Sequence, residues 1–157
     1  MKTFTHRSVI PATLEQITAF YEDPRILGWL TPPPIIMQVR SDKRTSLTSG
    51  ELEFTLWFGP LPVRWKARHE PAAIEYAFVD RMIEGPVAYW VHQHGYRPVE
   101  GGIELTDEIS IEHQKTGFWS LFTRLVFDGL PLRFLFIYRH LRTRWSAPRL
   151  QPKATMG

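Results

Sequence analysis

The stretch GPVAYWVHQHGYRPVEGGIELTDEIS, residues 85–110, decides how this chain of 157 residues folds. Apolar and polar residues alternate on both sides of the Gly101-Gly102 pair, which is typical of two half-buried strands joined by a tight turn. Polar side chains interrupt the apolar positions at His92, His94 and Asp107. Buried polar groups need partners, so this hairpin is also the first candidate for a functional site.

The same alternation extends through most of the chain. Glycine-proline pairs at residues 59–60 and 85–86 supply further turns. One face of each segment is apolar and the other polar, which favours an antiparallel sheet with one wet face. The predicted strands cover residues 3–10, 35–40, 51–58, 63–70, 74–84, 88–96 and 103–112.

Two short helices are predicted after the first strand. The sequence TLEQ, residues 13–16, has the spacing of a capping box and so marks the start of a helix. Asp23-Pro24 ends that helix, and proline suits the first turn of a second one, which ends near Trp29.

A long helical segment is predicted near the C-terminus. An apolar stripe runs over residues 118–126, Asp128-Gly129-Leu130-Pro131 interrupts it, and a second helix follows to about Trp145. This is the only long helix that could cover the sheet, so the fold class is α+β, with a curved antiparallel sheet wrapped around the C-terminal helix. The segment LPLRFLFIY, residues 130–138, is apolar almost all round. It is either sunk deep in the core or a contact surface for a dimer, a partner or a membrane.

Composition limits the class of protein. Hydrophobic residues make up 43% and charged residues 22%, which indicates one globular domain, taken as residues 1–145 with a flexible tail at 146–157. The chain has no cysteine, which excludes disulfides and thiolate chemistry and fits the cytoplasm. We expect no secretory signal and no membrane span. The net charge of +3 comes without a nucleic-acid motif, so no nucleic-acid partner is expected.

The turns also suggest a strand register. A turn at residues 98–102 would place His92 opposite Asp107 and Tyr96 opposite Ile103. A turn at residues 85–87 would place Asp80 opposite His92. Side chains that face each other across antiparallel strands are neighbours on one face, so Asp80, His92 and Asp107 should form a row on the buried face.

This row has three interpretations. It can be a structural network that fixes the register. It can instead line a cavity and orient a ligand's polar group, with His92 and a carboxylate as an acid–base pair. Finally, His92, His94 and a carboxylate can bind a metal ion. Of the other histidines, we expect His6 and His69 in the core or at a pocket rim, and His113 and His140 at the surface.

Several segments resemble a known family. They are SVIPATLEQITAFYEDP (8–24), FVDRMIEGPVAYWVHQHGY (78–96), GGIELTDEISIEH (101–113) and FIYRHLRTR (136–144). Their order is similar to the START/SRPBCC superfamily, the helix-grip fold of polyketide cyclases and the birch-pollen-allergen group. The chain resembles more closely the small bacterial SRPBCC proteins labelled cyclase/dehydrase-like or cell division inhibitor-like.

The resemblance implies a deep apolar cavity between the sheet and the terminal helix. Members of the superfamily bind lipids, sterols, polyketides and hormones, and some catalyse cyclisation or dehydration. We therefore expect the chain to bind a hydrophobic small molecule of lipid, polyketide or aromatic type, without a metal or other cofactor. The expected ligand-binding residues are Trp65, Phe78, Asp80, Met82, Trp90, His92, His94 and Asp107.

Two other functions stay open at this point. A cyclase or dehydratase would use His92, Asp107 and Asp80 as its catalytic candidates, although the sequence favours binding over catalysis. Alternatively, a docking protein would act through the apolar terminal helix, which could also form a homodimer.

Overall fold

The computed structural model describes residues 1–73 and 77–151 and confirms the predicted order of elements. Strand β1 (Lys2–Ile10) leads into helices α1 (Leu14–Glu22) and α2 (Arg25–Trp29). The chain ends with helices α3 (Phe118–Val126) and α4 (Gly129–Ser146) and a short 3-10 turn, Ala147–Arg149. Between them lie β2 (Ile36–Asp42), β3 (Gly50–Phe58), β4 (Leu61–Pro71), β5 (Phe78–Glu84), β6 (Tyr89–Val99) and β7 (Gly102–Glu112). Residues 74–76 of the predicted fifth strand lie outside the described residues.

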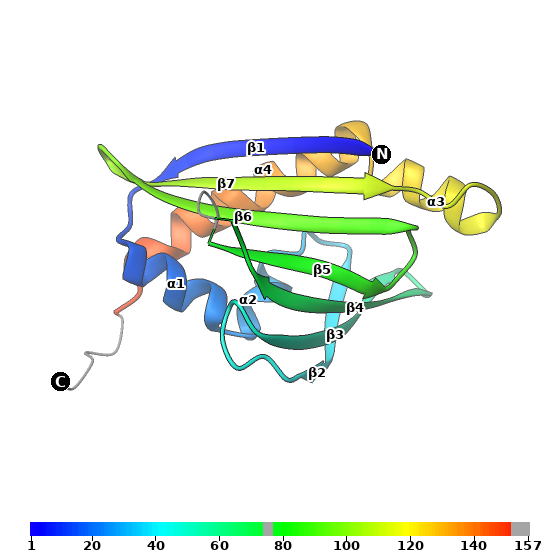
Figure 1. Cartoon of the computed structure of the whole chain (residues 1–157), viewed down its shortest axis with the longest axis horizontal. Coiled ribbons are helices and arrows are strands. Elements are labelled where there is room, and N and C mark those ends of the chain that lie inside the picture. Colours follow the sequence, from blue (N-terminus) through cyan, green and yellow to red (C-terminus); the bar gives the residue numbers. More distant parts are fainter. Residues whose placement is uncertain (74–76, 152–157) are drawn as a thin grey trace.

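The seven strands form one antiparallel sheet in the order β1-β7-β6-β5-β4-β3-β2. Figure 1 shows α4 lying behind β1, β7 and β6, with α1 beside the C-terminal end of α4, and α2 contacts β2. The sheet thus covers the long helix, and the predicted α+β helix-grip architecture is confirmed. β6 and β7 are interior strands with neighbours on both sides, and their inward side chains are shielded from solvent.

The hairpin of β6 and β7 is tighter than the sequence suggested. Val99 pairs with Gly102 and His94 with Asp107, while His92 faces Ile109 rather than Asp107. The predicted register was wrong by two residues because β6 continues through Pro98 instead of ending at Tyr96. A shift of two preserves which face each side chain occupies, so the polar residues stay on the buried face. The predicted pairing of Asp80 with His92 is confirmed.

The capping box at the start of α1 is present. The backbone N–H of Gln16 donates to Thr13 Oγ1 (3.2 Å), and the backbone N–H of Thr13 donates to Gln16 Oε1 (2.9 Å). The Gln16 amide also donates to the carbonyls of Pro148 and Leu150, at 3.0 Å each. Ala147 is fully buried. The predicted flexible tail is therefore packed against α1 in its first residues, and residues 152–157 lie outside the described part.

Helix α4 packs only one of its faces against the sheet. Leu132, Phe136, His140 and Thr143 are buried, at the spacing of one helical face. The other side exposes five large apolar residues, the α4 stripe: Leu130, Phe134, Ile137, Leu141 and Trp145. Of the two alternatives left open for this segment, burial deep in the core is therefore wrong for the side that carries the stripe. No described helix is long and apolar enough to cross a membrane.

The β6–β7 turn gives a test of the fold. Gly101 and Gly102 both have positive φ, at 89° and 143°. A Cβ on Gly101 meets open space, whereas one on Gly102 would lie 2.0 Å from the carbonyl oxygen of Ile10 in β1.

We expect Gly101→Ala to lower the free energy of unfolding by about 1–3 kcal/mol through backbone strain alone. Gly102→Ala should cost clearly more, because β1 must also move. Urea unfolding of both variants measures this, and equal losses would contradict the close approach of β1.

Candidate functional site

The candidate site is organised around one buried carboxylate, that of Asp107. Its Oδ1 accepts a hydrogen bond from His92 Nε2 (2.6 Å), and its Oδ2 accepts one from His140 Nε2 (2.6 Å). His94 Nδ1 lies 3.1 Å from Oδ1, an electrostatic contact that is not aligned as a hydrogen bond. Asp107 is only 1% exposed, so the three imidazoles replace the water that a carboxylate would otherwise require.

These residues reach one another from separate elements. Asp107 lies on β7, directly opposite His94 of β6, and His92 approaches it along the diagonal. His140 enters from the buried face of α4 and carries the network on to β1, since its Nδ1 lies 2.5 Å from Ser8 Oγ. The network therefore holds the terminal helix against the sheet.

Burial and hydrogen bonding fix the charges. Burial by itself would raise the pKa of Asp107, but the three histidines outweigh it and hold that pKa well below its usual range. Burial lowers the pKa of His92, and it lowers the pKa of His94 to about 4, with a further contribution from the neighbouring His92. At neutral pH the pair His92 and His94 is uncharged and Asp107 is a carboxylate.

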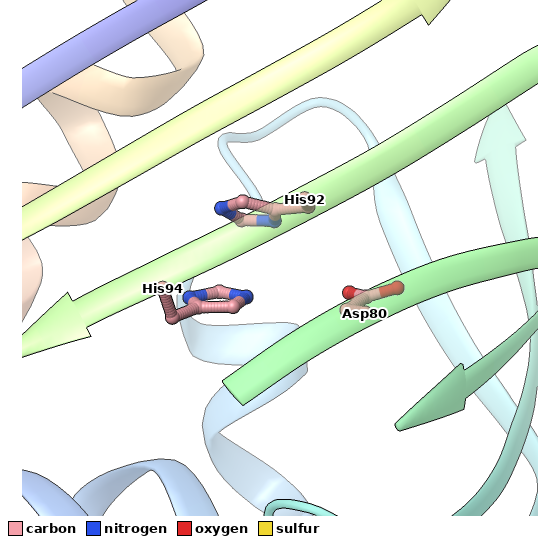
Figure 2. A group of neighbouring side chains, drawn as sticks. All are labelled: Asp80, His92 and His94. Carbon is pink, nitrogen blue, oxygen red and sulfur yellow. The ribbon is translucent and has the colours of Figure 1, made fainter. Parts of the chain in front are cut away.

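Each imidazole of the His92–His94 pair has a second nitrogen. Because Asp107 is contacted by His92 Nε2 and His94 Nδ1, the remaining atoms are His92 Nδ1 and His94 Nε2. Figure 2 shows that each ring turns one nitrogen towards Asp80 of β5. Asp80 Oδ1 is buried and has no hydrogen-bond partner among the described residues. One potential ligand atom from each of these three residues lies within 4.8 Å of the other two.

The face of the histidine pair opens onto a cavity of about 120 Å³ between the sheet, α4 and α2. Apolar side chains of β3, including Leu52, Phe54 and Leu56, form one wall, and Leu135 and Phe136 of α4 form another. The structure places six of the eight predicted ligand-binding residues on this cavity: Trp65, Phe78, Asp80, Trp90, His92 and His94. The other two do not line it. Met82 packs on the apolar cluster beside it, and Asp107 lies behind the histidines.

Two cationic side chains, Arg44 and Arg139, also line the cavity, and Arg44 is paired with Asp42. Arg139 of α4 lies among its lining residues, and its Nε is buried without a hydrogen-bond partner among the described residues. A second hollow, of about 700 Å³, is lined by charged residues of both signs, among them Arg64, Lys66 and Glu84. It does not include the histidines, so the smaller cavity is the candidate site.

Two histidines are not where the sequence suggested. His140, expected at the surface, is buried against Asp107. His113, also expected at the surface, is buried and bonded through Nδ1 to Thr123 Oγ1 at 2.9 Å. Helical spacing could have located His140, since it follows Leu132 and Phe136 at intervals of four, but the nearly continuous apolar segment hid this face. The expectation for His69 is confirmed: it is buried, and its Nδ1 lies 2.9 Å from the carbonyl of Leu47.

Comparison with known proteins identifies the fold. No family model matches the chain, and no curated protein matches it in sequence. Protein CV1439 from Chromobacterium violaceum is 14% identical, with a TM-score of 0.67, and the match covers 94% of this chain and 99% of that one. Ara h 8.0201 is 8% identical, with a TM-score of 0.59 and 93% coverage of both chains. A nucleoside-diphosphate sugar epimerase from Corynebacterium glutamicum is 24% identical, with a TM-score of 0.65. This match covers 90% of the present chain but only 28% of the epimerase. At these identities the likeness shows the helix-grip fold alone.

The buried histidines predict sensitivity to acid. The folded-state pKa of His94 is about 4, below its ordinary value of 6.5, so between these values the unfolded chain binds a proton that the folded chain does not. Stability therefore rises with pH in this window and is lost as the pH falls from 6.5 towards 4. Asp107, with its lowered pKa, acts in the same direction at lower pH.

Each net proton changes the free energy of unfolding by about 1.4 kcal/mol per pH unit. We expect urea unfolding of the wild type between pH 7 and pH 4.5 to show this slope. His94→Asn should be less stable at pH 7 but have a slope that is shallower by about one proton. An unchanged slope in the variant would show that His94 titrates normally.

Proposed function

We propose that the chain binds a small, mostly apolar molecule in the cavity between the sheet and α4. The observation that carries this proposal is the composition of the cavity. Apolar and aromatic side chains form most of its lining, and polar groups converge at one end, where His92 and His94 are held by Asp107. Apolar walls with a few convergent polar groups are characteristic of small-molecule sites.

The size of the cavity narrows the ligand class. Drug-sized ligands occupy pockets of about 300–1,000 Å³, whereas an apolar cavity of about 150 Å³ is enough to hold benzene. A cavity of about 120 Å³ therefore fits a single aromatic ring better than a lipid or a polyketide. In this proposal the ring contacts Trp65, Phe54 and Phe136, and its polar substituent meets the histidine pair. The two larger ligand classes would require side chains to move.

The proposal places this activity in one domain, residues 1–145, acting in the cytoplasm. The cysteine-free sequence supports that location, and the helix-grip fold supports the ligand class. We also propose that the chain is a member of the cell division inhibitor-like subgroup of SRPBCC proteins. This is supported by the segments at 78–96 and 101–113, which form the hairpin that carries the histidine pair.

One observation favours an enzyme as the second candidate. The Asp107 carboxylate receives the Nε2 proton of His92 and so fixes the tautomer that leaves Nδ1 free, the arrangement of an oriented general base. A cyclase or dehydratase could use such a base on a bound ring. Against this, burial lowers the pKa of His92, which makes it a weak base.

A pair of leucines on α4 allows a matched test of binding. Leu135 lines the cavity, whereas Leu141, on the same helix, is 61% exposed. Leu135→Trp should fill the cavity and lower the affinity for a small phenol by at least about tenfold, while Leu141→Trp leaves it unchanged. Quenching of the cavity tryptophans measures binding, and native mass spectrometry of freshly purified protein detects any co-purified ligand. Equal affinities in the two variants would overturn the proposal.

A second variant, in the same assay, tests the polar end of the cavity, where His92 and His94 lie. His92→Ala removes the group that faces the ligand's substituent, so it should weaken phenol binding while leaving benzene binding nearly unchanged. Equal loss of both probes would point to a collapsed cavity instead. Chemical conversion of a bound compound, with a pH profile that the His92 variant abolishes, would replace the binding proposal with the enzymatic one.

A further inference from the structure

We propose that Asp80, His92 and His94 form a binding site for a divalent transition-metal ion at the polar end of the cavity. The sequence alone favours no metal, but the geometry brings one carboxylate and two imidazoles together. One potential ligand atom from each lies within 4.8 Å of the other two, and Figure 2 shows the carboxylate facing both rings. This spacing allows one ion, bound at about 2.0–2.2 Å from each atom, to contact all three.

The hydrogen-bonding chemistry of the three atoms explains why a cation fits there. His92 uses its Nε2 proton on Asp107, and His94 has its Nδ1 beside the same carboxylate. The His92 nitrogen turned towards Asp80 is therefore a lone-pair donor without a proton, and the His94 nitrogen is one in the tautomer that carries its proton on Nδ1, beside Asp107. The carboxylate of Asp80 is also an acceptor, and its Oδ1 has no hydrogen-bond partner among the described residues. In that tautomer three acceptors converge without a donor, and a cation bound between them would offset their repulsion.

Asp107 supplies the outer support that metal-binding histidines require. Such histidines almost always donate their second ring N–H to a carboxylate or a carbonyl, which fixes the ring and raises its basicity. Here one buried carboxylate contacts the second nitrogen of both rings, at 2.6 and 3.1 Å. It is fixed in turn by His140 from α4. The site is thus held by β5, β6, β7 and the terminal helix before any ion arrives.

The ligand set indicates the class of ion. Two imidazoles and one carboxylate suit Zn²⁺, Co²⁺, Ni²⁺ or Fe²⁺ and are poorly suited to Ca²⁺, which prefers oxygen ligands. Three protein ligands leave at least one coordination position for another molecule. All three residues line the cavity, so that position faces the space proposed for the apolar ligand. The site does not depend on the proposed ligand, because the ion can be tested alone.

Binding of Co²⁺ to the full chain, stripped with EDTA and dialysed, tests the site. We expect one equivalent to bind in calorimetry, with visible absorption bands of nitrogen- and oxygen-coordinated Co²⁺. Asp80→Asn should weaken binding by more than about 100-fold, because it removes a ligand rather than an outer support. Asp23→Asn is the matched control, since this aspartate pairs with Arg25 outside the cavity and should leave binding unchanged.

Each outcome of that experiment separates the metal site from the proposed function. Circular dichroism checks that Asp80→Asn is folded. Leu135→Trp should block the phenol but still bind Co²⁺, which shows that the two properties are independent. Failure to bind one equivalent, or equal affinity in Asp80→Asn and the wild type, would overturn the metal site and leave the cavity proposal standing.

A different observation, the α4 stripe, carries a second inference: we infer that this face docks on an anionic lipid surface. Its five residues follow one another at intervals of three or four, so they lie along one side of the helix. Leu130, Phe134 and Trp145 are 78%, 60% and 70% exposed. A helix with one such apolar face and basic flanks is typical of binding in the plane of a membrane surface.

The positive charges beside the α4 stripe indicate which kind of surface binds there. Residues 129–146 contain four arginines and no acidic residue. At 100° per residue, Arg133 and Arg144 flank one edge of the stripe and Arg142 lies beyond the other. A second copy docked through the same face would bring arginines against arginines, whereas anionic headgroups complement them. The surface therefore fits lipid better than a homodimer.

Vesicle flotation tests this inference. We expect the chain to float with phosphatidylcholine vesicles that contain phosphatidylglycerol, and not with phosphatidylcholine alone. Replacing both Arg133 and Arg144 by Gln should weaken binding by about thirtyfold. The double variant Phe134→Ser, Leu141→Ser should abolish it, and Ile36→Ser, at an exposed position on β2, should leave it unchanged. Equal binding to both vesicle types, or to neither, would overturn the inference. So would a concentration-dependent dimer that the double serine variant dissolves.

Discussion

The structure depends on the burial of one negative charge. A carboxylate that is 1% exposed is costly unless it is paired and fully hydrogen-bonded, and Asp107 achieves this with imidazoles from two separate elements. β6 provides His92 and His94, and α4 provides His140. If the helix slid by one turn or the strands by two residues, the carboxylate would lose a donor. The electrostatic requirement therefore fixes the position of the helix over the sheet more tightly than apolar packing alone could.

Much of this arrangement could be predicted from the sequence, because it follows from short-range patterns. Alternation located the strands and their inner faces, and the capping box and the Asp-Pro pair located α1 and α2. The approach of Asp80 to His92 followed from one turn. The register of β6 with β7 did not, because Pro98 is compatible with either a strand or a turn. Since the error was two residues, Asp107 stayed on the face of the histidines, directly opposite His94 and diagonal to His92.

Contacts between residues that are far apart in the sequence could not be predicted from these short-range patterns. His140 lies 33 residues from Asp107, and its helical spacing from Leu132 and Phe136 was hidden in a nearly continuous apolar segment. The volume of the cavity depends on how rings such as Phe54 and Phe136 pack, and composition does not determine this. Likewise, the apolar segment at 130–138 could not be divided into an inner and an outer face until the sheet was placed against it. That division matters most for function, because the inner face of α4 borders the cavity while its outer face carries the stripe.

The shared carboxylate also constrains how the sequence can drift. Asp107 loses the donors that offset its burial if the histidines change, and His92, His94 and His140 lose their common acceptor if the aspartate changes. Replacing His92, His140 or Asp107 alone leaves a buried partner without its hydrogen bond, so a lineage should keep the set or exchange it for an apolar core. In an alignment of descendants, these four columns should vary as a block, and the position of Ser8 should follow His140.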